Sequence, residues 1–365
     1  MAATARNRLL IAGVIVALII ILAAAYLAFF RQPQVVQLTI EYGQPWEQLV
    51  KPAIEQFKRE MEAQGVKVEI TENLIPYGVD IAQKITSDLA AGTAGDILIV
   101  DSFLIPSYVE SGYLLDITDF VNQWPDWNQF PEPMQKIVSY KGRVYGVMID
   151  TDVRMIWYRK DIFEMAGLPR DWQPKTWDDI LEAARILKQN EDKIKQALGI
   201  DEFYPFYIPA GTNWGEGTTA QGFYMLLLGA DKPPYNRLYD YEKEKWICKS
   251  TALWRSFKFY IDVYSTGLGP VEYNFVSDVW GTHRKVFAEG KVAMDVGGSW
   301  EWNEGWGPNG VAPIPNREQV VGFAKMPGYK GGAEGEPRFV TVSGGWAVAL
   351  NAKLAEDETK LKYAW

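Results

Sequence analysis

The stretch that decides the fold is VVQLTIEYGQPWEQLVKPAIEQFKREMEAQGVKVEIT, residues 35–71. It predicts a strand at 35–41, a helix at 46–61 whose apolar residues recur at helical spacing, and a second strand at 66–71. A second helix at 81–90 and a third strand at 96–100 continue the alternation. This order predicts an α/β fold with a mainly parallel sheet, right-handed crossovers and helices on both faces.

Side chains suited to ligand binding follow these strands. Trp46 and Tyr77 lie in the segments after the first and second strands, and Asp101 and Ser102 come directly after the third. Ligands of open α/β sheets bind beyond the carboxyl ends of the strands, so these side chains are predicted to meet on one rim. The rim therefore carries two aromatic rings and a carboxylate.

The chain is too long for one hydrophobic core, because single cores stop growing at about 250–300 residues. Two lobes are therefore predicted after an N-terminal segment. The boundaries are 1–34 for that segment, 35–150 for the first part of lobe I, 151–312 for lobe II and 313–365 for a return to lobe I. Within lobe II, Thr176 and Asp179 predict a capping box at the start of an amphipathic helix.

Residues 9–30 form an uncharged apolar run, with Arg6 and Arg8 before it and Arg31 after it. A helix of this length covers about 33 Å, enough to cross a hydrocarbon core of about 30 Å. The arginine excess before the run favours a cytoplasmic N-terminus and an external body. The run is predicted to be a transmembrane anchor or a signal peptide cleaved near the alanines at 23–25, and the anchor is the favoured form. The body would then lie at the cell surface, anchored or secreted.

The composition excludes several classes of partner. A net charge of −9 argues against nucleic acid and anionic lipid surfaces, which call for clustered Lys and Arg. Cys248 is the only cysteine, so the chain has no intramolecular disulfide and no lipid-modified cysteine after the apolar run. The 15 Trp and 19 Tyr are more than a core of this size needs.

The sequence contains partial matches to two motifs of enzymes, and both are incomplete. The glycines at 305, 307 and 310 have the spacing of a dinucleotide loop, but Pro308 interrupts them and no strand-turn-helix surrounds them. Ser299 lacks the glycine two positions later that a nucleophile elbow requires.

His283 is the only histidine, which excludes a multi-histidine zinc site. Its neighbours Arg284 and Lys285 predict that it lies on an exposed helix face. No catalytic residue, metal or cofactor is predicted, and the chain is not expected to be an enzyme.

Aromatic rings beside carboxylates are typical of saccharide binding. A sugar offers an apolar C–H face to a flat ring and hydroxyls to charged acceptors. Covering one such face contributes on the order of 1 kcal/mol. Trp46, Trp300 and Trp346 are the strongest candidates because they lie beside Gly, Pro or Ser at expected loops or strand ends.

Several further motifs occur in a fixed order. They are DSF (101–103), ESGYL (110–114), GRVYG (142–146), Asp152, WYRKD (157–161), GLP (167–169), TWD (176–178), FAEGKVAM (287–294), GGSW (297–300) and GGW (344–346). Together they resemble the extracellular solute-binding proteins of ABC sugar importers, in particular the maltose/trehalose-binding group. The resemblance runs from about residue 38 to the last residue.

The resemblance implies a two-lobe, type II periplasmic-binding-protein-like clamshell, in which each lobe is a mainly parallel sheet flanked by helices. Such a protein closes on a sugar or oligosaccharide in the cleft between its lobes and delivers it to an ABC permease with its ATPase subunits. It is expected to work as a monomer. Family members continue beyond the Gly-Gly-Trp strand into a helix and back to the second lobe, so this chain is expected to be truncated at its C-terminus.

Carried over by position, the resemblance assigns roles to individual residues. Asp101 corresponds to the first-lobe carboxylate that binds sugar hydroxyls, and Asp152 to the acidic position at the first crossing between lobes. Arg154 either pairs with Asp152 or reaches the ligand. The stacking aromatic of the second lobe corresponds to Trp300, with Glu301 or Trp302 nearby, and the late ligand-binding segment to Gly345 and Trp346. Asp150 and Tyr77 are weaker candidates.

Two other functions stay open from the residues alone. A glycoside hydrolase would also place paired carboxylates in a Trp-lined cleft. A solute-binding protein with another cargo, such as a peptide, would keep the transport role.

Overall fold

The computed structural model describes residues 19–20, 34–76, 79–240 and 242–365. The apolar run at 9–30, apart from Ile19 and Ile20, lies outside the described residues, and so does Tyr77. No helix in the described part of the chain has both the length and the apolar character needed to cross a membrane.

The chain divides into two compact units. Unit 1 contains the chain up to Asp150 together with Gly345–Trp365, and unit 2 contains Thr151–Gly344. The first division falls at the predicted position. The predicted return at residue 313 is wrong, because residues 313–344 belong to unit 2. The reason is strand pairing, since a strand at Val321–Ala324 pairs with one at Arg154–Arg159 inside unit 2.

Unit 1 is built around five strands with helices on both sides. The strands of its main sheet are β1 (Gln34–Gly43), β2 (Val66–Ile75), β3 (Ile97–Asp101), β6 (Val147–Met148) and β15 (Trp346–Leu350). The α-helices are α2 (Glu47–Ala63), α3 (Ile81–Ala91), α4 (Ile105–Glu110), α5 (Thr118–Gln123), α6 (Glu132–Ile137) and α14 (Glu358–Ala364). Smaller elements are η1 (Gln44–Trp46), η2 (Ser102–Leu104), η3 (Pro125–Gln129), η8 (Ala352–Glu356) and the ribbon of β4 (Ser139–Tyr140) with β5 (Arg143–Val144).

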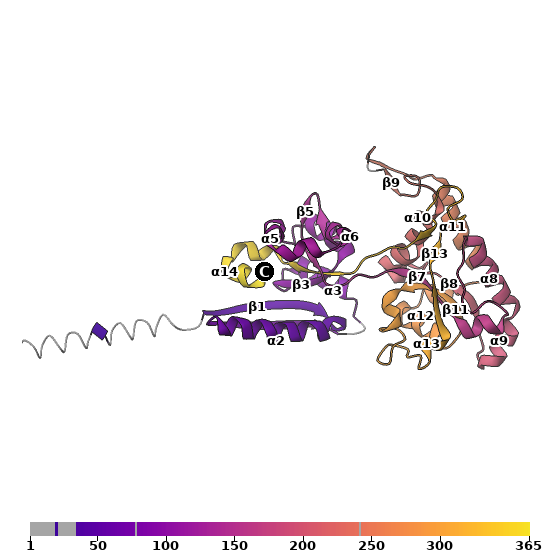
Figure 1. Cartoon of the computed structure of the whole chain (residues 1–365), viewed down its shortest axis with the longest axis horizontal. Coiled ribbons are helices and arrows are strands. Elements are labelled where there is room, and N and C mark those ends of the chain that lie inside the picture. The colour runs from indigo at the N-terminus through magenta and orange to yellow at the C-terminus, as the bar shows by residue number, and fades with distance from the viewer. Residues whose placement is uncertain (1–18, 21–33, 77–78, 241) are drawn as a thin grey trace, which may run out of the picture. The chain divides into compact units, whose positions relative to one another are not determined.

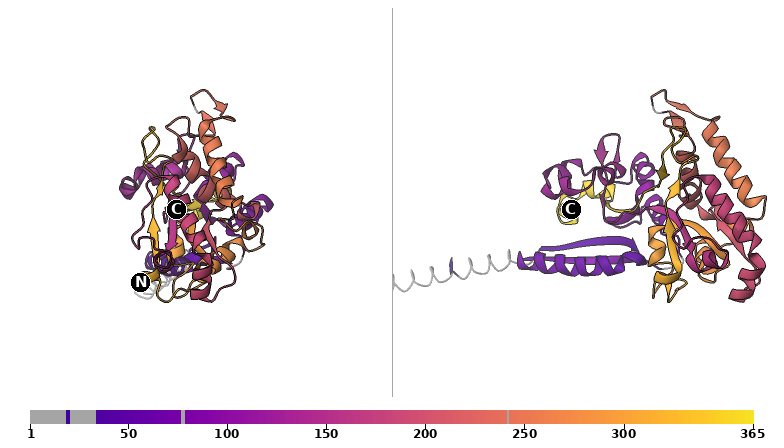
Figure 2. Two further views of the ribbon diagram at one scale, coloured as in Figure 1. Left: turned by 90° about the vertical axis from the view of Figure 1, so that its right-hand side faces the viewer. Right: turned by 45° about the vertical axis from the view of Figure 1, so that its right-hand side comes forward.

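The predicted β-α-β-α-β order of unit 1 is confirmed. β1 pairs in parallel with β2 and β3, so the strand order β2-β1-β3 has the first strand in the middle. Helix α2 lies along β1 and β2, as Figure 1 and the right view of Figure 2 show. It packs Val50 and Ile54 against Ile40 and Tyr42 of β1. The other face of the sheet carries a larger core around Leu98, which includes residues of α3, α4 and α5.

Unit 2 is built around a four-stranded sheet. Its strands are β12 (Val321–Ala324), β7 (Arg154–Arg159), β11 (Val292–Gly298) and β8 (Tyr204–Tyr207), in that order across the sheet. The α-helices are α7 (Lys160–Met165), α8 (Trp177–Gln189), α9 (Glu191–Leu198), α10 (Tyr224–Ala230), α11 (Thr251–Tyr264), α12 (Val279–Ala288) and α13 (Arg317–Val320). Smaller elements are η4 (Thr212–Trp214), the π-helical η5 (Thr218–Phe223), η6 (Glu272–Asn274), η7 (Ser299–Trp302), the ribbon β9 (Tyr239–Asp240) with β10 (Lys245–Trp246), and the ribbon β13 (Met326–Pro327) with β14 (Phe339–Val340).

Both faces of the unit 2 sheet are covered. Along β7, Ile156 and Tyr158 enter the core that contains α8, α10 and α11, whereas Trp157 enters the core on the α12 side. This period-2 alternation is the signature of a strand buried on both faces. The predicted capping box of α8 is confirmed: the Thr176 hydroxyl accepts from the Asp179 N–H at 3.2 Å, and the Asp179 carboxylate accepts from the Thr176 N–H at 3.0 Å.

The prediction of a mainly parallel sheet in each unit needs correction, because both sheets are mixed. In unit 1, β15 is antiparallel to both neighbours, and in unit 2, β7 is antiparallel to both neighbours. Each of these is the first strand formed after the chain enters that unit, at Gly345 and at Thr151. Hydrophobic periodicity reports which residues are buried but not the direction of a strand, so the sequence could not show this.

Glu41 is a buried carboxyl on β1 whose titration affects the stability of unit 1. Its side chain is 1% exposed, and its Oε2 accepts a hydrogen bond from the Gly95 N–H at 3.0 Å. Burial, assisted by the neighbouring Asp88, raises the pKa of Glu41 to about 7. The folded chain therefore binds this proton more tightly than the unfolded chain does, and stability falls as the pH rises from the unfolded pKa toward 7.

Glu41→Gln should remove this pH dependence. Glutamine keeps an acceptor for Gly95 but does not titrate. Between about pH 4.5 and 8, the free energy of unfolding of the wild type should fall relative to that of the variant by up to about 3 kcal/mol. Urea unfolding across this pH range measures the difference. Parallel curves for the two proteins would contradict the assignment.

Candidate functional site

Trp46 and Trp346 form an aromatic pair in unit 1. Their ring centres lie 4.3 Å apart, and their planes are tilted by 46°. Asp150 holds both residues, because its Oδ2 accepts a hydrogen bond from Trp46 Nε1 at 3.1 Å and its Oδ1 accepts one from the Trp346 N–H at 2.6 Å. Both tryptophans are half-buried. One carboxylate thus fixes the indole of Trp46 and the backbone of Trp346, and both rings are partly exposed.

Gly345 makes this arrangement possible. Its φ of +138° is a conformation that residues with a Cβ rarely adopt. An added Cβ would lie 2.6 Å from the backbone O of Asp150 and 2.7 Å from its Oδ1. Together, Trp46, Asp150, Gly345 and Trp346 are called the Trp46 group below.

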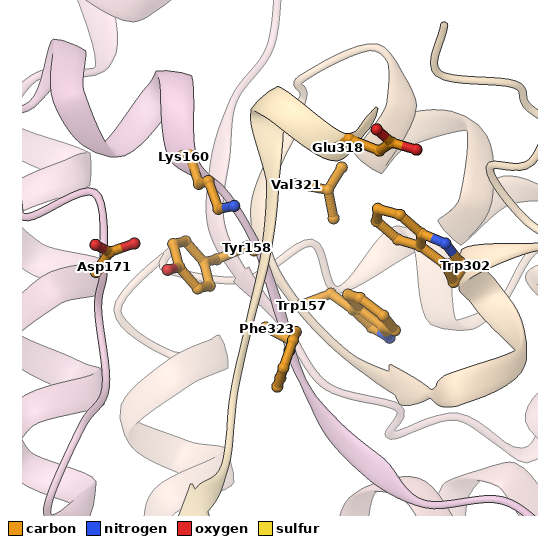
Figure 3. A pocket seen from close by; sticks show the side chains of 9 residues that line it. Trp157, Tyr158, Lys160, Asp171, Trp302, Glu318, Val321 and Phe323 are labelled. Carbon is orange, nitrogen blue, oxygen red and sulfur yellow. The ribbon is translucent and has the colours of Figure 1, made fainter. Parts of the chain in front are cut away.

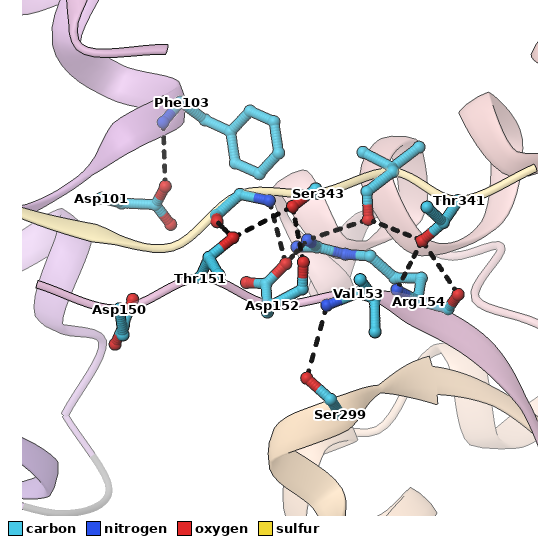
Figure 4. A network of polar contacts seen from close by, with 12 residues as sticks. Asp101, Phe103, Asp150, Thr151, Asp152, Val153, Arg154, Ser299, Thr341 and Ser343 are labelled. Atoms are coloured by element: carbon cyan, nitrogen blue, oxygen red, sulfur yellow. Dashed lines mark hydrogen bonds and ion pairs between the residues drawn. The ribbon is translucent and has the colours of Figure 1, made fainter. Parts of the chain in front are cut away.

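Asp101 and Ser102 lie next to the Trp46 group. Trp346 is opposite Asp101 in the register of β15 and β3, and the Ser102 N–H donates to the backbone O of Gly345 at 3.0 Å. The Asp101 carboxylate accepts from the Phe103 N–H at 2.9 Å, which begins η2 (Figure 4). Ser102 is 1% exposed. The structure therefore brings together six predicted residues of unit 1, namely Trp46, Asp101, Ser102, Asp150, Gly345 and Trp346.

Trp300 is held in unit 2 by Arg154. The guanidinium carbon of Arg154 lies 5.0 Å from the centre of the Trp300 ring, within the range of a cation–π interaction. Arg154 is 5% exposed and forms an ion pair with Asp152. The sequence left open whether Arg154 pairs with Asp152 or faces the ligand, and the structure shows the pairing. Asp152, Arg154, Gly298 and Trp300 are called the Trp300 group.

Gly298 provides the seat of the Trp300 ring. Its backbone is extended, with φ −92° and ψ 167°, so any residue could adopt this conformation. An added Cβ would nevertheless overlap the Trp300 indole. The GGSW motif therefore has a structural reason, since its second glycine leaves the space that the indole needs.

Asp152 also organises the chain at the start of β7. Its Oδ1 accepts from the Gly344 N–H at 2.9 Å, and its backbone O accepts from the Ser343 hydroxyl at 2.6 Å. The Thr341 hydroxyl binds both the N–H and the O of Arg154, at 2.9 and 3.0 Å (Figure 4). Asp152 thus has a structural role within unit 2.

Sequence reasoning missed two residues that complete this network, Ser299 and Thr341. Ser299 was considered only as a nucleophile, yet its N–H donates to the backbone O of Val153 at 2.9 Å, and its hydroxyl accepts from the Val153 N–H at 3.3 Å. Thr341 carries no local signal. Its role arises only because residues 187 positions apart meet.

The structure separates Trp302 from the Trp300 group. Its ring is nearly parallel to that of Trp157, with centres 6.1 Å apart, and the Arg317 guanidinium lies 4.8 Å from its centre. Trp302 lines a cavity of about 540 Å³ within unit 2 (Figure 3), with lining residues that include Trp157, Lys160, Asp171, Glu318 and Phe323. Tyr77, the remaining predicted residue, lies outside the described residues.

The prediction that His283 lies on an exposed helix face is wrong, because its side chain is 1% exposed. His283 is on the inner face of α12 with Val279, Val286 and Phe287. Its charged neighbour Arg284 is also drawn inward, because Glu301 pairs with its guanidinium. Glu301 is itself 0% exposed, so it points away from solvent although Trp300 precedes it in the chain.

Among the described residues, no group of three or more His, Cys, Asp or Glu side chains is arranged to hold a metal ion. The two groups therefore offer aromatic rings and carboxylates, and the Trp300 group adds one guanidinium. This chemistry suits a neutral polyhydroxylated ligand with apolar faces.

The model of the bacterial extracellular solute-binding protein family matches residues 39–365. The chain belongs to this family. The match confirms the family that the ordered motifs of the sequence resemble, and it covers elements of both units. Structurally similar proteins of this kind have two domains of mixed α/β content, as this chain has.

Some curated relatives of this solute-binding protein have names that state no ligand, and others are named for sugars. A lactose-binding protein of Rhizobium radiobacter is 29% identical over 141 residues, which is 37% of this chain and 32% of that protein. A maltodextrin-binding protein of Bacillus subtilis is 25% identical over 294 residues, which is 78% of this chain and 62% of that protein. The chain thus spans between about a third and three fifths of the length of these relatives.

A solved structure extends the likeness to the fold. An ABC transporter solute-binding protein of Thermotoga lettingae, bound with alpha-D-tagatose, superposes with a TM-score of 0.67 at 25% identity. The superposition covers 91% of this chain and 76% of that one. All three proteins are named as binding proteins.

Proposed function

We propose that this chain is the substrate-binding component of an ABC transporter, which captures a sugar or oligosaccharide and delivers it to a membrane permease and its ATPase. The observation that carries the proposal is the Trp46–Trp346 pair fixed by Asp150. Two partly exposed rings that contact each other, with a carboxylate beside them, suit the C–H face of a sugar, and each stacked face contributes on the order of 1 kcal/mol. The sugar-binding relatives and the tagatose-bound structure support this ligand class.

Each unit is proposed to contribute its own residues to ligand binding. In unit 1 these are the Trp46 group with Asp101 and Ser102, and in unit 2 it is Trp300, which Arg154 holds in place. Tyr77 stays a prediction from the sequence. The family supports a clamshell-type action, in which binding energy favours the ligand-bound closed form that the permease reads.

The proposed location is the outer side of the cytoplasmic membrane, which follows from the extracellular family. Attachment by residues 9–30, or their removal as a signal peptide, stays a prediction from the sequence. A retained anchor would raise the local concentration of the binding protein near its permease.

The proposal is tested by a ligand panel of lactose, maltotriose, alpha-D-tagatose, diacetylchitobiose and triglycine. Thermal shift and calorimetry on the whole chain should show binding of at least one saccharide and no binding of triglycine, which represents peptide cargo. Binding of triglycine alone would contradict the sugar assignment.

The same panel separates binding from hydrolysis. Prolonged incubation with maltotriose or diacetylchitobiose, followed by chromatography, should show the saccharide unchanged. Asp150 and Asp152 support this expectation, because each already accepts hydrogen bonds that fix its orientation within the protein. Catalytic release of smaller sugars would overturn the proposal.

Gly298→Ala should weaken saccharide binding. It should not strain the backbone, because the backbone of Gly298 is extended. The new Cβ displaces the Trp300 indole from its seat. Affinity for the tightest-binding saccharide of the panel should fall about tenfold, whereas the unfolding temperature should fall by only a few degrees. Calorimetry and thermal unfolding measure the two effects. Unchanged affinity would show that the seat of Trp300 is irrelevant to binding.

A further inference from the structure

The short helix η7 has two consecutive residues with opposite environments. Trp300 is half-buried and contacts Arg154, whereas Glu301 is 0% exposed. A carboxylate so fully buried is costly unless charged partners and hydrogen bonds compensate for the lost water. Its partners therefore determine how firmly η7, and with it Trp300, is held.

Glu301 is anchored to α12 through two cationic side chains. Arg284 Nε lies 2.7 Å from Glu301 Oε2, and Arg284 Nη2 lies 3.1 Å from Oε1. His283 Nε2 lies 3.4 Å from the same Oε1. The arrangement is bidentate on the arginine side, which fixes the plane of the carboxylate as well as its position.

His283 links this contact to the strand that leads into η7. Its Nδ1 lies 2.9 Å from Asp295 Oδ2, and Asp295 is on β11 three residues before Gly298. His283, Arg284, Asp295 and Glu301, called the buried charge cluster, thus join α12 to both β11 and η7. The cluster thus connects β11, which contains Gly298 beneath the Trp300 ring, to η7, which contains Trp300.

The backbone after η7 depends on Glu301 too. Its carbonyl oxygen accepts from the N–H groups of Gly305 and Trp306, at 3.1 and 2.9 Å. The Trp306 indole N–H in turn donates to the backbone O of Arg284 at 3.1 Å. The segment on both sides of Glu301 is therefore bound to α12.

The cluster is balanced when His283 is charged. Burial alone would lower the pKa of His283, but the charges of Asp295 and Glu301 outweigh it and raise the pKa to about 9. Burial would raise the pKa of Glu301, but Arg284 and His283 lower it to about 2. Burial also raises the pKa of Asp295, although the charge of His283 opposes this effect. His283 stays protonated beside these carboxyl groups at neutral pH and loses its charge only as the pH rises through about 9.

Beyond Asp295 and Glu301, the groups around His283 are aromatic rings and the charged side chains that surround Arg284. Asp295 on β11, Glu301 on η7 and the rings of Trp214 and Trp280 face His283. Arg284 is its neighbour on α12, and Tyr207 on β8 lies opposite Asp295 in the sheet. Burial raises the pKa of Tyr207 well above its usual range, so this phenol stays neutral. Glu304 lies 3.9 Å from Arg284, and the charge of Asp278 at the start of α12 also acts on Arg284.

We propose that His283 and Glu301 are positioning residues, which hold η7 through the buried charge cluster and thereby set the orientation of the Trp300 indole for saccharide binding. This inference rests on the proposed function. Neither residue touches the ligand. A consequence is that saccharide affinity should depend on the charge of the only histidine in the chain.

The test measures the affinity of four proteins for the tightest-binding saccharide of the panel: the wild type, His283→Gln, Trp300→Ala and the double variant. Calorimetry at about pH 7 and at about pH 10 covers both charge states of His283. At about pH 7, His283→Gln should weaken saccharide binding about fivefold. The double variant should bind only slightly more weakly than Trp300→Ala. Wild-type affinity should fall as the pH rises through about 9, whereas both single variants should show flat profiles.

A merely structural histidine would lower the unfolding temperature without moving these profiles. Equal affinity of the wild type and His283→Gln, or losses that simply add in the double variant, would overturn the inference while the saccharide-binding role of Trp300 stands. Unchanged affinity in Trp300→Ala would overturn both. If His283→Gln does not fold, the pH profiles of the wild type and of Trp300→Ala decide, because a profile that persists without Trp300 contradicts the positioning role.

Discussion

Gly345→Ala is expected to abolish most saccharide affinity, with a loss of about 30-fold or more, and to destabilise unit 1 by about 2–3 kcal/mol. Gly345 has a φ of +138°, and a Cβ there would lie 2.6 Å from the backbone O of Asp150. The backbone must shift to relieve this contact. Asp150 would then lose its hydrogen bonds to Trp46 Nε1 and to the N–H of Trp346.

A matched control separates backbone strain from the effect on the site. Gly112 also has a positive φ, +72°, but a Cβ there meets nothing within 4 Å. Gly112→Ala should therefore show a destabilisation of about 1 kcal/mol and no change in affinity. Calorimetry and urea unfolding of the two variants measure both quantities. If Gly345→Ala binds saccharide as tightly as Gly112→Ala does, the Trp46 group is not the ligand site of unit 1.

Trp300→Ala is expected to weaken saccharide binding by about 10- to 30-fold, which corresponds to the loss of one stacked face and of its contacts. Trp300 is partly exposed, so its removal should change the free energy of unfolding by less than about 1 kcal/mol. Affinity and stability should thus separate, with the larger effect on affinity. Titration calorimetry and urea unfolding of the same preparation measure both.

Trp302→Ala is the matched control, because it removes the same side chain two residues along the same short helix. Trp302 packs beside Trp157 and under Arg317. This variant should lose about 1–2 kcal/mol of stability and less than about threefold in affinity. The reverse pattern, with Trp302 the more important for affinity, would move the ligand site of unit 2 to the cavity that Trp302 lines.

The fold of the first third of the chain could be predicted because its signals are local. Apolar spacing between Val35 and Val100 defines β1, α2, β2, α3 and β3 to within a few residues, and parallel pairing follows from their alternation. The antiparallel direction of β15 and β7 could not be predicted. It depends on where the chain re-enters a unit, which no local pattern records.

The boundaries of unit 2 also depend on long-range pairing, which no local pattern records. The glycine-rich stretch at 328–335 does not show which unit holds residues 313–344. Long-range contacts assign them to unit 2, above all the pairing of β12 with β7. His283 is a second example, because its sequence neighbours Arg284 and Lys285 predicted exposure. The charge of Arg284 is neutralised by Glu301, which is 17 positions away and invisible to reasoning from neighbours.

The residues of the candidate site were easier to find than their roles. Trp46, Asp150 and Trp346 were chosen for their chemistry and position, and the structure places them in one hydrogen-bonded group. Arg154 was predicted with two possible roles. Its pairing with Asp152 and its contact with Trp300 depend on side-chain geometry that a sequence pattern does not contain.

The central claim is that the aromatic rings of the two units bind a saccharide. The most direct measurement is calorimetric titration of the whole chain and of a Trp300→Ala/Trp346→Ala double variant with the tightest-binding saccharide of the panel. We expect saturable binding by the wild type with a negative heat-capacity change, and a loss of affinity of about 100-fold or more in the double variant. Equal affinity of the two proteins, or no saccharide binding by the wild type, would contradict the account.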